Sequence, residues 1–278
     1  MAPPPRPRIV FLDIDGTYAD RGVVPPGHAR AVAAARAAGN RVLLCTGRPR
    51  SMLTRHILAA GFDGMVASAG GYVEVGGAVL RDQRFPRDLA ERVIAVLDAH
   101  DAAYLLEAPE ALYGRPDVRR RLGELLGGHL RDPDAAADGQ GDVLDALRVP
   151  ERLEECSFAK VTYFGAASPW PVVADALGDG LDLLPSSITG LGDTAGEIQL
   201  AGVHKALGIQ TVLDHLGAGR EDVVAFGDGP NDLEMLEYAG TSVAIAGADP
   251  RLLALADHVA AGPGAEGLVP AFAELGLV

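Results

Sequence analysis

The chain has 278 residues, of which 48% are hydrophobic, and its 24 basic and 38 acidic side chains give a formal net charge of −14. This length allows one large domain or two modest ones, and we expect two. The negative charge argues against nucleic acid or an anionic membrane as a partner, because both repel an acidic surface. No uncharged apolar run reaches roughly 18 residues, which argues against a membrane-spanning helix and predicts a soluble protein.

The N-terminal residues and the cysteines together predict a cytoplasmic protein. Residues 1–8 are rich in proline and arginine and lead directly into a strand-like run, without the long apolar stretch of a signal peptide. The chain has two cysteines, Cys45 and Cys156. Such sparse usage favours two small core residues in a reducing compartment over a disulfide.

The first segment alternates between strand-like and helix-like patterns. Residues 8–12 form a nearly continuous apolar run, which is typical of a strand covered on both faces. The predicted elements are a strand over 8–12, a helix over 28–38 that ends at Gly39-Asn40, a strand over 41–45 and a helix over 51–60. This β-α-β-α order predicts a parallel sheet with right-handed crossovers.

The last segment repeats this pattern. We expect helices over 204–216, 230–239, 250–256 and 266–275, and strands over 222–226 and 241–246. The two outer segments, 1–81 and 201–278, are therefore predicted to form one discontinuous α/β domain with a doubly wound, Rossmann-like parallel sheet.

The middle segment, 82–200, differs in character and is predicted to be an inserted α/β domain. Its expected strands cover 103–107, 158–164, 181–184 and 197–200, and its expected helices cover 87–99, 117–126 and 169–177. Residues 131–142 are polar and contain glycine and proline, which predicts a surface loop.

Two acidic residues follow the first strand, in the sequence Asp13-Ile14-Asp15-Gly16-Thr17. Ligands of open parallel sheets bind beyond the carboxyl ends of the strands, so these acids lie where chemistry is expected. Alternation along an extended segment would turn Asp13 and Asp15 the same way. Two carboxylates at one spot need a cation or a proton between them, and both options suit phosphoryl transfer. One acid can attack phosphorus while the other protonates the leaving oxygen. The alternative is that both acids cap a turn.

Two further strand ends carry polar side chains. The strand over 41–45 leads into Thr46-Gly47-Arg48, whose hydroxyl can hold a phosphoryl oxygen. The strand over 222–226 leads into Gly227-Asp228-Gly229-Pro230-Asn231-Asp232, where carboxylates and an amide are suitable ligands for Mg²⁺. Each motif alone could be a simple turn. Three such strand ends together favour a site.

Lys205 and Lys160 are the only lysines of the chain. Lys205 opens the helix after the middle segment and is suited to balance the charge of an attacking carboxylate and an incoming phosphate. Lys160 lies in an alternating strand, so a solvent-facing side chain is the favoured interpretation there.

These segments, taken in order, resemble the motifs of the haloacid dehalogenase superfamily of phosphotransferases. Residues 13–17 are similar to the first motif, Thr46 to the second, Lys205 to the third and residues 227–232 to the fourth. The resemblance covers the two outer segments, well over half of the chain. It implies a phosphatase.

The resemblance implies the roles of the acidic residues. Asp13 would be the nucleophile that carries an aspartyl-phosphate, and Asp15 the general acid and base. Asp228 would bind Mg²⁺ together with the Asp13 carboxylate and the backbone carbonyl of Asp15. Asp232 would support this site or serve as an alternate ligand.

The resemblance also implies which residues hold the phosphoryl group. Thr46, Gly47 and Lys205 would bind it, and Asn231 would orient Lys205 or the substrate. A small phosphorylated metabolite such as a sugar phosphate is the expected partner.

The place of the insert, before Val203-His204-Lys205, is similar to the Cof-like branch of the superfamily, which has a large α/β cap (type IIB). The segments 225–229 and 264–269 resemble that branch as well. The cap is expected to close over the strand ends and to contact the substrate. Its candidate contacts are Glu107, Tyr113, Arg115 and Lys160.

Two other functions remain open from the sequence. A phosphomutase of the same fold would return the phosphoryl group to a substrate hydroxyl. A non-catalytic protein would bind Mg²⁺ and a phosphorylated ligand without turnover, although the intact Asp13/Asp15 pair disfavours this.

Overall fold

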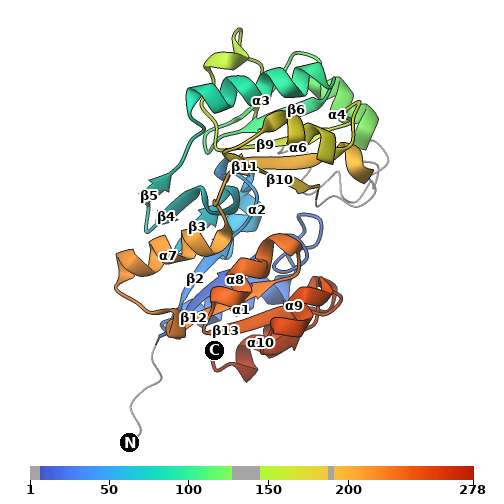
Figure 1. Cartoon of the computed structure of the whole chain (residues 1–278). Coiled ribbons are helices and arrows are strands. Elements are labelled where there is room, and N and C mark those ends of the chain that lie inside the picture. The colour runs from blue at the N-terminus through green and yellow to red at the C-terminus, as the bar shows by residue number, and fades with distance from the viewer. Residues whose placement is uncertain (1–6, 127–144, 187–190) are drawn as a thin grey trace, which may run out of the picture. The chain divides into compact units, whose positions relative to one another are not determined.

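Two β-sheets organise the parts of the chain that the computed structural model describes, residues 7–126, 145–186 and 191–278 (Figure 1). The chain divides into two units. The core unit contains the residues up to Arg48, Leu53–Arg81 and His204–Val278, and the insert unit contains Pro49–Met52 and Asp82–Val203. Pro49–Met52 thus groups with the insert although it lies far from it in sequence. None of the described helices is long and apolar enough to cross a membrane.

The core unit contains the larger sheet, with the strand order β14-β13-β12-β1-β2-β3-β4-β5. Strands β14 to β3 in this order pair in parallel, whereas β4 is antiparallel to β3. The strands are β1 Ile9–Leu12, β2 Arg41–Cys45, β3 Gly64–Ala67, β4 Tyr72–Val75, β5 Ala78–Asp82, β12 Val223–Gly227, β13 Thr241–Ile245 and β14 His258–Ala260. In Figure 1 the blue β1 and β2 share this sheet with the orange-red β12 and β13.

Successive residues of the central strands face opposite sides of this sheet, and helices cover both sides. Val10 and Leu12 pack in one cluster with residues of α1 and α10, whereas Ile9 and Phe11 pack in another with residues of α7, α8 and α9. These helices are α1 Pro26–Ala37, α7 Lys205–Leu216, α8 Leu233–Tyr238, α9 Pro250–Leu255 and α10 Leu268–Glu274. A short α2, Arg55–Leu58, follows β2. The predicted doubly wound α/β core is confirmed.

The strand order reverses direction at β1. The chain adds β2 and β3 on one side of β1 and later adds β12, β13 and β14 on the other side. In open α/β sheets, the crevice beyond the carboxyl ends of the strands at such a switch point is where ligands bind. The fold therefore makes the ends of β1 and β12 the place to look for a site.

The insert unit contains a mainly antiparallel sheet with the order β10-β11-β9-β6-β7-β8. Its strands are β6 Ala103–Glu107, β7 Leu112–Tyr113, β8 Leu147–Arg148, β9 Lys160–Phe164, β10 Leu181–Pro185 and β11 Gly196–Leu200, and its helices are α3 Arg87–Ala99, α4 Val118–Leu126 and α6 Trp170–Leu177. Tyr104, Leu106, Val161 and Ile198 pack with residues of α3 and α6 on one face of this sheet.

Several predicted elements differ in the structure. The helix predicted over 51–60 is a 3₁₀ turn at Arg50–Met52 followed by α2, because the Thr54 side chain accepts from the Ile57 N–H and caps a new helix. The helix predicted over 230–239 begins as a 3₁₀ turn at Pro230–Asp232. Cys45 is buried as predicted, whereas Cys156 is only partly buried. The loop predicted over 131–142 lies outside the described residues.

The C-terminal segment that resembles the Cof-like branch has a structural role in the core unit. Glu266 accepts a hydrogen bond from the Gly27 N–H at the start of α1, at 2.6 Å. The Leu268 N–H donates to Nε2 of the fully buried His28 at 3.2 Å, and His28 Nδ1 lies 3.0 Å from the Tyr18 carbonyl oxygen. Because Nε2 accepts, the proton of a neutral His28 is on Nδ1.

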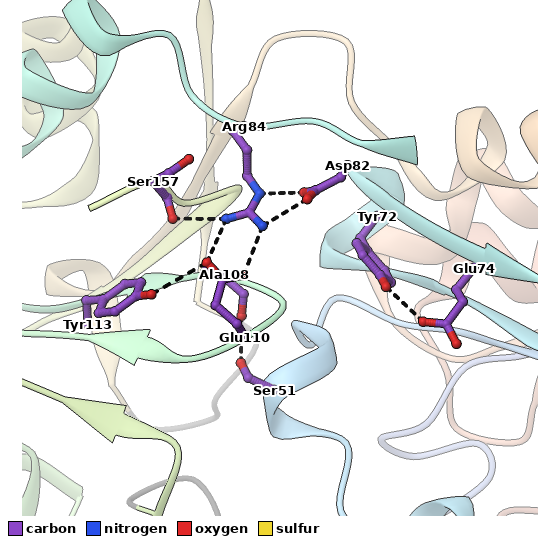
Figure 2. A network of polar contacts seen from close by, with 9 residues as sticks. All are labelled: Ser51, Tyr72, Glu74, Asp82, Arg84, Ala108, Glu110, Tyr113 and Ser157. Carbon is purple, nitrogen blue, oxygen red and sulfur yellow. Dashed lines mark hydrogen bonds and ion pairs between the residues drawn. The ribbon is translucent and has the colours of Figure 1, made fainter. Parts of the chain in front are cut away.

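Arg84 connects the first residues of the insert unit with later segments of the same unit through hydrogen bonds. The Arg84 guanidinium donates to both carboxylate oxygens of Asp82, to both of Glu110 and, at 3.0 Å, to the Ser157 carbonyl oxygen. Figure 2 shows Arg84 at the centre of this group. Within the same unit, the Ser51 hydroxyl donates to the Ala108 carbonyl oxygen at 2.7 Å. The Arg84 bonds tie Glu110 and Ser157, which are distant in sequence, to the segment that precedes α3.

Candidate active site

Asp13 lies at the carboxyl end of β1, where the sheet switches direction. Its backbone N–H donates to the Phe226 carbonyl oxygen of β12 at 3.0 Å, which ties the ends of these two strands together. The Asp13 side chain is 9% exposed. A carboxylate that is so nearly buried needs a partner, and Lys205 supplies it from another segment of the core unit.

The chain turns directly after Asp13. The Tyr18 N–H donates to the Asp13 carbonyl oxygen and the Ala19 N–H to the Ile14 carbonyl oxygen, so this segment is not extended. The extended conformation expected from Asp13 to Asp15 is therefore wrong, although the Asp15 carboxylate still lies near enough to help raise the pKa of Asp13. The Asp15 side chain is 51% exposed and forms two hydrogen bonds with Arg48 instead, from Nε at 2.7 Å and from Nη2 at 2.5 Å.

Asp228 approaches this turn from the end of β12. The buried Thr17 hydroxyl donates to Asp228 Oδ1 at 2.7 Å. Gly16 has φ +89°, and a Cβ atom at this position would lie 2.2 Å from Asp228 Oδ2. Only glycine therefore leaves room for the Asp228 carboxylate at this backbone conformation.

Asp232 stabilises the loop that carries Asp228. Its Oδ2 accepts hydrogen bonds from the backbone N–H groups of Asp228 and Gly229, both at 3.0 Å. A Cβ atom at position 227 would collide with the Asp232 side chain at 2.6 Å, which explains a glycine at the end of β12. The fully buried Asp232 thus holds the loop in a single arrangement.

Lys205 joins the two ends of the site. Its side chain is 0% exposed, and Nζ donates to Asp13 Oδ1 at 2.6 Å and to Asp232 Oδ1. Burial works to lower the pKa of Lys205, but the carboxylates of Asp13 and Asp232 outweigh burial, so the pKa is raised and the ammonium stays charged. Of the two roles predicted for Asn231, orienting Lys205 is not supported, because Asp232 makes this contact and the Asn231 side chain forms no hydrogen bond with the described residues. Orienting the substrate stays a prediction.

Three carboxylates form a group that can bind a divalent cation. One oxygen of each of Asp13, Asp228 and Asp232 lies within 4.8 Å of the others. Burial raises the pKa of Asp13 well above its usual range, with Lys205 opposing and the neighbouring acids adding to the rise. Burial likewise raises the pKa of Asp228 to about 6, against the Thr17 hydrogen bond. The single ammonium of Lys205 does not neutralise three carboxylates that lie this close together. The group is therefore suited to bind a hard cation, which prefers oxygen ligands.

The other predicted phosphate-binding residues follow β2. Thr46 is 1% exposed, and its Oγ1 accepts from the Arg48 N–H at 3.1 Å. Gly47 lies between them. The structure adds Thr17 and Arg48 to the residues at these strand ends. Both stand inside the motifs that the sequence singled out, Asp-Gly-Thr and Thr-Gly-Arg, but residue type alone did not indicate their partners.

The predicted contact residues of the insert unit divide into two kinds. Lys160 is 4% exposed, so the interpretation as a solvent-facing lysine is wrong. Its Nζ lies 2.7 Å from Glu197 and 3.5 Å from Glu107, and these acids keep the Lys160 pKa high against the effect of burial. Tyr113 and Arg115 are less buried. Arg115 pairs with Asp98 and Glu154, and the Tyr113 hydroxyl lies 3.5 Å from Glu110 (Figure 2).

Comparison with known proteins decides the family. The sequence model of the haloacid dehalogenase-like hydrolases matches residues 10–271. The chain belongs to this family. The predicted resemblance to haloacid dehalogenase phosphatases is thereby confirmed, and the site lies at the strand ends that carry the family resemblance.

Relatives of the family match the chain over almost their whole length. The protein YkrA of Bacillus subtilis (strain 168) is 26% identical over 276 residues, which cover 98% of each chain. A phosphoglycolate phosphatase of Archaeoglobus fulgidus is 28% identical over 273 residues, which cover 98% of this chain and 99% of the relative.

Solved structures support the same fold. A protein of Geobacillus kaustophilus has a TM-score of 0.79 at 25% identity, with 98% of this chain and 100% of that chain covered. The subclass IIB sugar phosphatase BT4131 has a TM-score of 0.78 at 20% identity, with the same coverage, and this likeness concerns the fold alone.

Proposed function

We propose that this family member hydrolyses a small phosphomonoester through an aspartyl-phosphate on Asp13, with Mg²⁺ as its cofactor. The observation that carries the proposal is the buried Asp13 carboxylate at the β1/β12 switch point, held by Lys205 at 2.6 Å and grouped with Asp228 and Asp232. This arrangement brings together a nucleophile, the ammonium group of Lys205 and oxygen ligands for a metal ion at one end of the sheet.

The chemistry divides into two displacements. In the first, an Asp13 oxygen forms a bond to phosphorus while the bond from phosphorus to the leaving oxygen breaks, and the protonated Asp15 carboxyl donates its proton to that oxygen. In the second, Asp15 takes a proton from water as the water oxygen attacks phosphorus and the bond to Asp13 breaks. The products are the alcohol and inorganic phosphate, and Asp15 is protonated again.

The remaining residues hold the reacting groups. Lys205 balances the charge of Asp13, and Thr46 and Gly47 bind phosphoryl oxygens. The groups that would hold Mg²⁺ are the Asp13 and Asp228 carboxylates and the backbone carbonyl of Asp15. Asp232 would support this site or serve as an alternate ligand. When bound, Mg²⁺ neutralises the charge that develops on the transferring phosphoryl group. The raised pKa values of Asp13 and Asp228 support this assignment, since a bound cation would stabilise the ionised form of both carboxylates.

The proposed substrate class rests on the family and on a named relative. A sugar phosphate or a similar small metabolite is proposed, because a relative matched along almost its whole length is named a phosphoglycolate phosphatase. The segment 82–200 is proposed to act as the cap that selects the leaving group, with 1–81 and 201–278 as the catalytic domain.

Phosphate release tests this function. Wild type and Asp13→Asn are compared on a panel of phosphomonoesters that includes sugar phosphates, with Mg²⁺ or with EDTA. We expect Mg²⁺-dependent release that Asp13→Asn abolishes. Asp63→Asn is the matched control, because Asp63 is a partly buried carboxylate of the core unit that pairs with Arg36. Release that persists in Asp13→Asn contradicts the nucleophile, and phosphoryl transfer between sugar positions without release indicates a mutase.

A further inference from the structure

Arg48 is held firmly at the candidate active site by its backbone. Its N–H donates to Thr46 Oγ1 at 3.1 Å, and its carbonyl oxygen accepts from the Ser68 N–H at 2.9 Å. Ser68 and the next residue, Ala69, have φ values of +48° and +52°, which non-glycine residues rarely adopt. Such unfavourable conformations persist where the surrounding structure demands them, and they are typical of functional sites. Here they join the loops after β2 and β3.

One edge of the Arg48 guanidinium is occupied and the other is available. Nε and Nη2 donate to the two oxygens of Asp15 at 2.7 and 2.5 Å. Within the described parts of the chain, Nη1 donates no hydrogen bond, and the Arg48 side chain is 19% exposed. A guanidinium has five N–H donors in one plane, so the pair with Asp15 fixes its orientation and leaves the Nη1 donors for a ligand.

The charges of the site show which ligand this would be. With all four carboxylates ionised, Asp13, Asp15, Asp228 and Asp232 supply four negative charges, whereas Lys205 and Arg48 supply two positive ones, which leaves a net charge of −2. A bound divalent cation brings this sum to zero, and the proton that Asp15 carries in the first displacement brings it to +1, which is still less than the two negative charges of a phosphoryl dianion. An incoming phosphoryl dianion therefore needs positively charged donors aimed at it. Lys205 already donates to two carboxylates.

We propose that Arg48 binds an oxygen of the substrate's phosphoryl group through Nη1 while its other edge holds the Asp15 carboxylate in place. This inference rests on the proposed phosphatase function and adds a residue that contacts the substrate. A planar guanidinium can make both contacts at once, whereas an ammonium group is a single point charge and cannot reproduce the paired geometry. The effect of Arg48→Lys is therefore closer to that of Arg48→Gln than the retained charge suggests.

The test measures binding of inorganic phosphate by calorimetry at saturating Mg²⁺, together with kcat and KM. Arg48→Gln is expected to weaken phosphate binding about 10- to 100-fold, the range for a lost hydrogen bond to a charged group, and to raise KM. The matched control is Arg36→Gln. Arg36 makes the same double hydrogen bond to Asp63, at 3.0 and 2.9 Å, away from the site residues, so its loss leaves phosphate affinity unchanged.

A second pair of variants separates phosphate contact from mere positioning of Asp15. If Arg48 contacts the phosphoryl group, adding Arg48→Gln to Asp15→Asn weakens phosphate binding further. If Arg48 only orients Asp15, the double variant binds phosphate as Asp15→Asn does, which overturns the proposal. Wild-type phosphate affinity in Arg48→Gln overturns it as well.

Failure of the proposed function has a different signature. Wild-type protein that binds phosphate but releases none from any phosphomonoester contradicts the hydrolase, while the binding comparison still decides the role of Arg48. Wild-type protein that binds no phosphate in the presence of Mg²⁺ overturns both.

Discussion

Replacement of Lys205 by methionine tests how the buried charges of the site are balanced. Methionine is an unbranched apolar side chain that can fill the space of the lysine stem without its charge. Lys205→Met removes the cation between Asp13 and Asp232 and leaves two almost fully buried carboxylates without it. Removing one partner of a buried ion pair costs about 3–5 kcal/mol, and we expect a loss of unfolding free energy in this range.

The loss depends on pH in a defined direction. The folded-state pKa of Lys205 is raised above the usual 10.5, so its stabilising effect is fully present below that pH and is lost as the pH rises through the folded value. In the variant the carboxylates can relieve the imbalance by taking up protons, since burial already raises the pKa of Asp13 and brings that of Asp228 to about 6. The deficit of the variant should therefore be largest near neutral pH and shrink in mild acid.

The assay is denaturant unfolding of both proteins with EDTA and with Mg²⁺. Under the proposed function Mg²⁺ should stabilise Lys205→Met more than wild type, because the cation then meets one more uncompensated negative charge. Binding at a hundred times the dissociation constant contributes about 2.7 kcal/mol. The turnover of Lys205→Met should fall strongly relative to that of the wild type.

Lys160→Met is the matched control for this experiment. Lys160 is likewise a buried lysine between two carboxylates, with a side chain only 5% exposed, but it lies in the insert unit. It should lose comparable stability without recovery in Mg²⁺. A loss below about 1 kcal/mol in Lys205→Met would refute the buried ion-pair reasoning. An equal response of both variants to Mg²⁺ would refute a cation site beside Lys205.

Three further predictions concern other parts of the structure. Gly16→Ala should weaken Mg²⁺ activation in a metal titration, because the added Cβ would lie 2.2 Å from Asp228 Oδ2 and would push that carboxylate away. An unchanged Mg²⁺ dependence would contradict this packing. His28 should destabilise the fold in acid. Burial lowers its pKa from 6.5, so its contribution is present above about pH 6.5 and lost below it, and in thermal unfolding the advantage of wild type over His28→Gln should shrink with acidity. Arg84→Gln should destabilise the insert unit by about 1–2 kcal/mol through lost hydrogen bonds, measured by hydrogen exchange, and wild-type protection would disprove this.

The sequence predicted secondary structure best where the local residue pattern and the tertiary environment favour the same element. The continuous apolar runs of β1 and β12 identify strands buried on both faces, and the glycines that stop helices mark their ends. Strands such as β7 and β8, with two residues each, carry too little periodicity to be recognised.

The same limit applies to the site. Residue type and strand-end position were enough to select Asp13 and Asp228, because parallel strands bring their carboxyl ends to one edge. Lys205 was selected because lysine is scarce and this one opens the helix after the middle segment. They could not assign partners. The contact of Asp232 with Lys205, where Asn231 was expected, depends on which side of a 3₁₀ turn each side chain occupies.

What the sequence by itself determined is the doubly wound core, the family and the residues gathered at the ends of β1, β2 and β12. The tertiary structure alone decided which charges meet. Asp15 pairs with Arg48 because the chain turns after Asp13, and Lys160 is buried between two acids although its strand alternates. The physical reason is that periodicity specifies which face a side chain takes, whereas a charge pair depends on the approach of segments up to about two hundred residues apart in sequence, which no local pattern records.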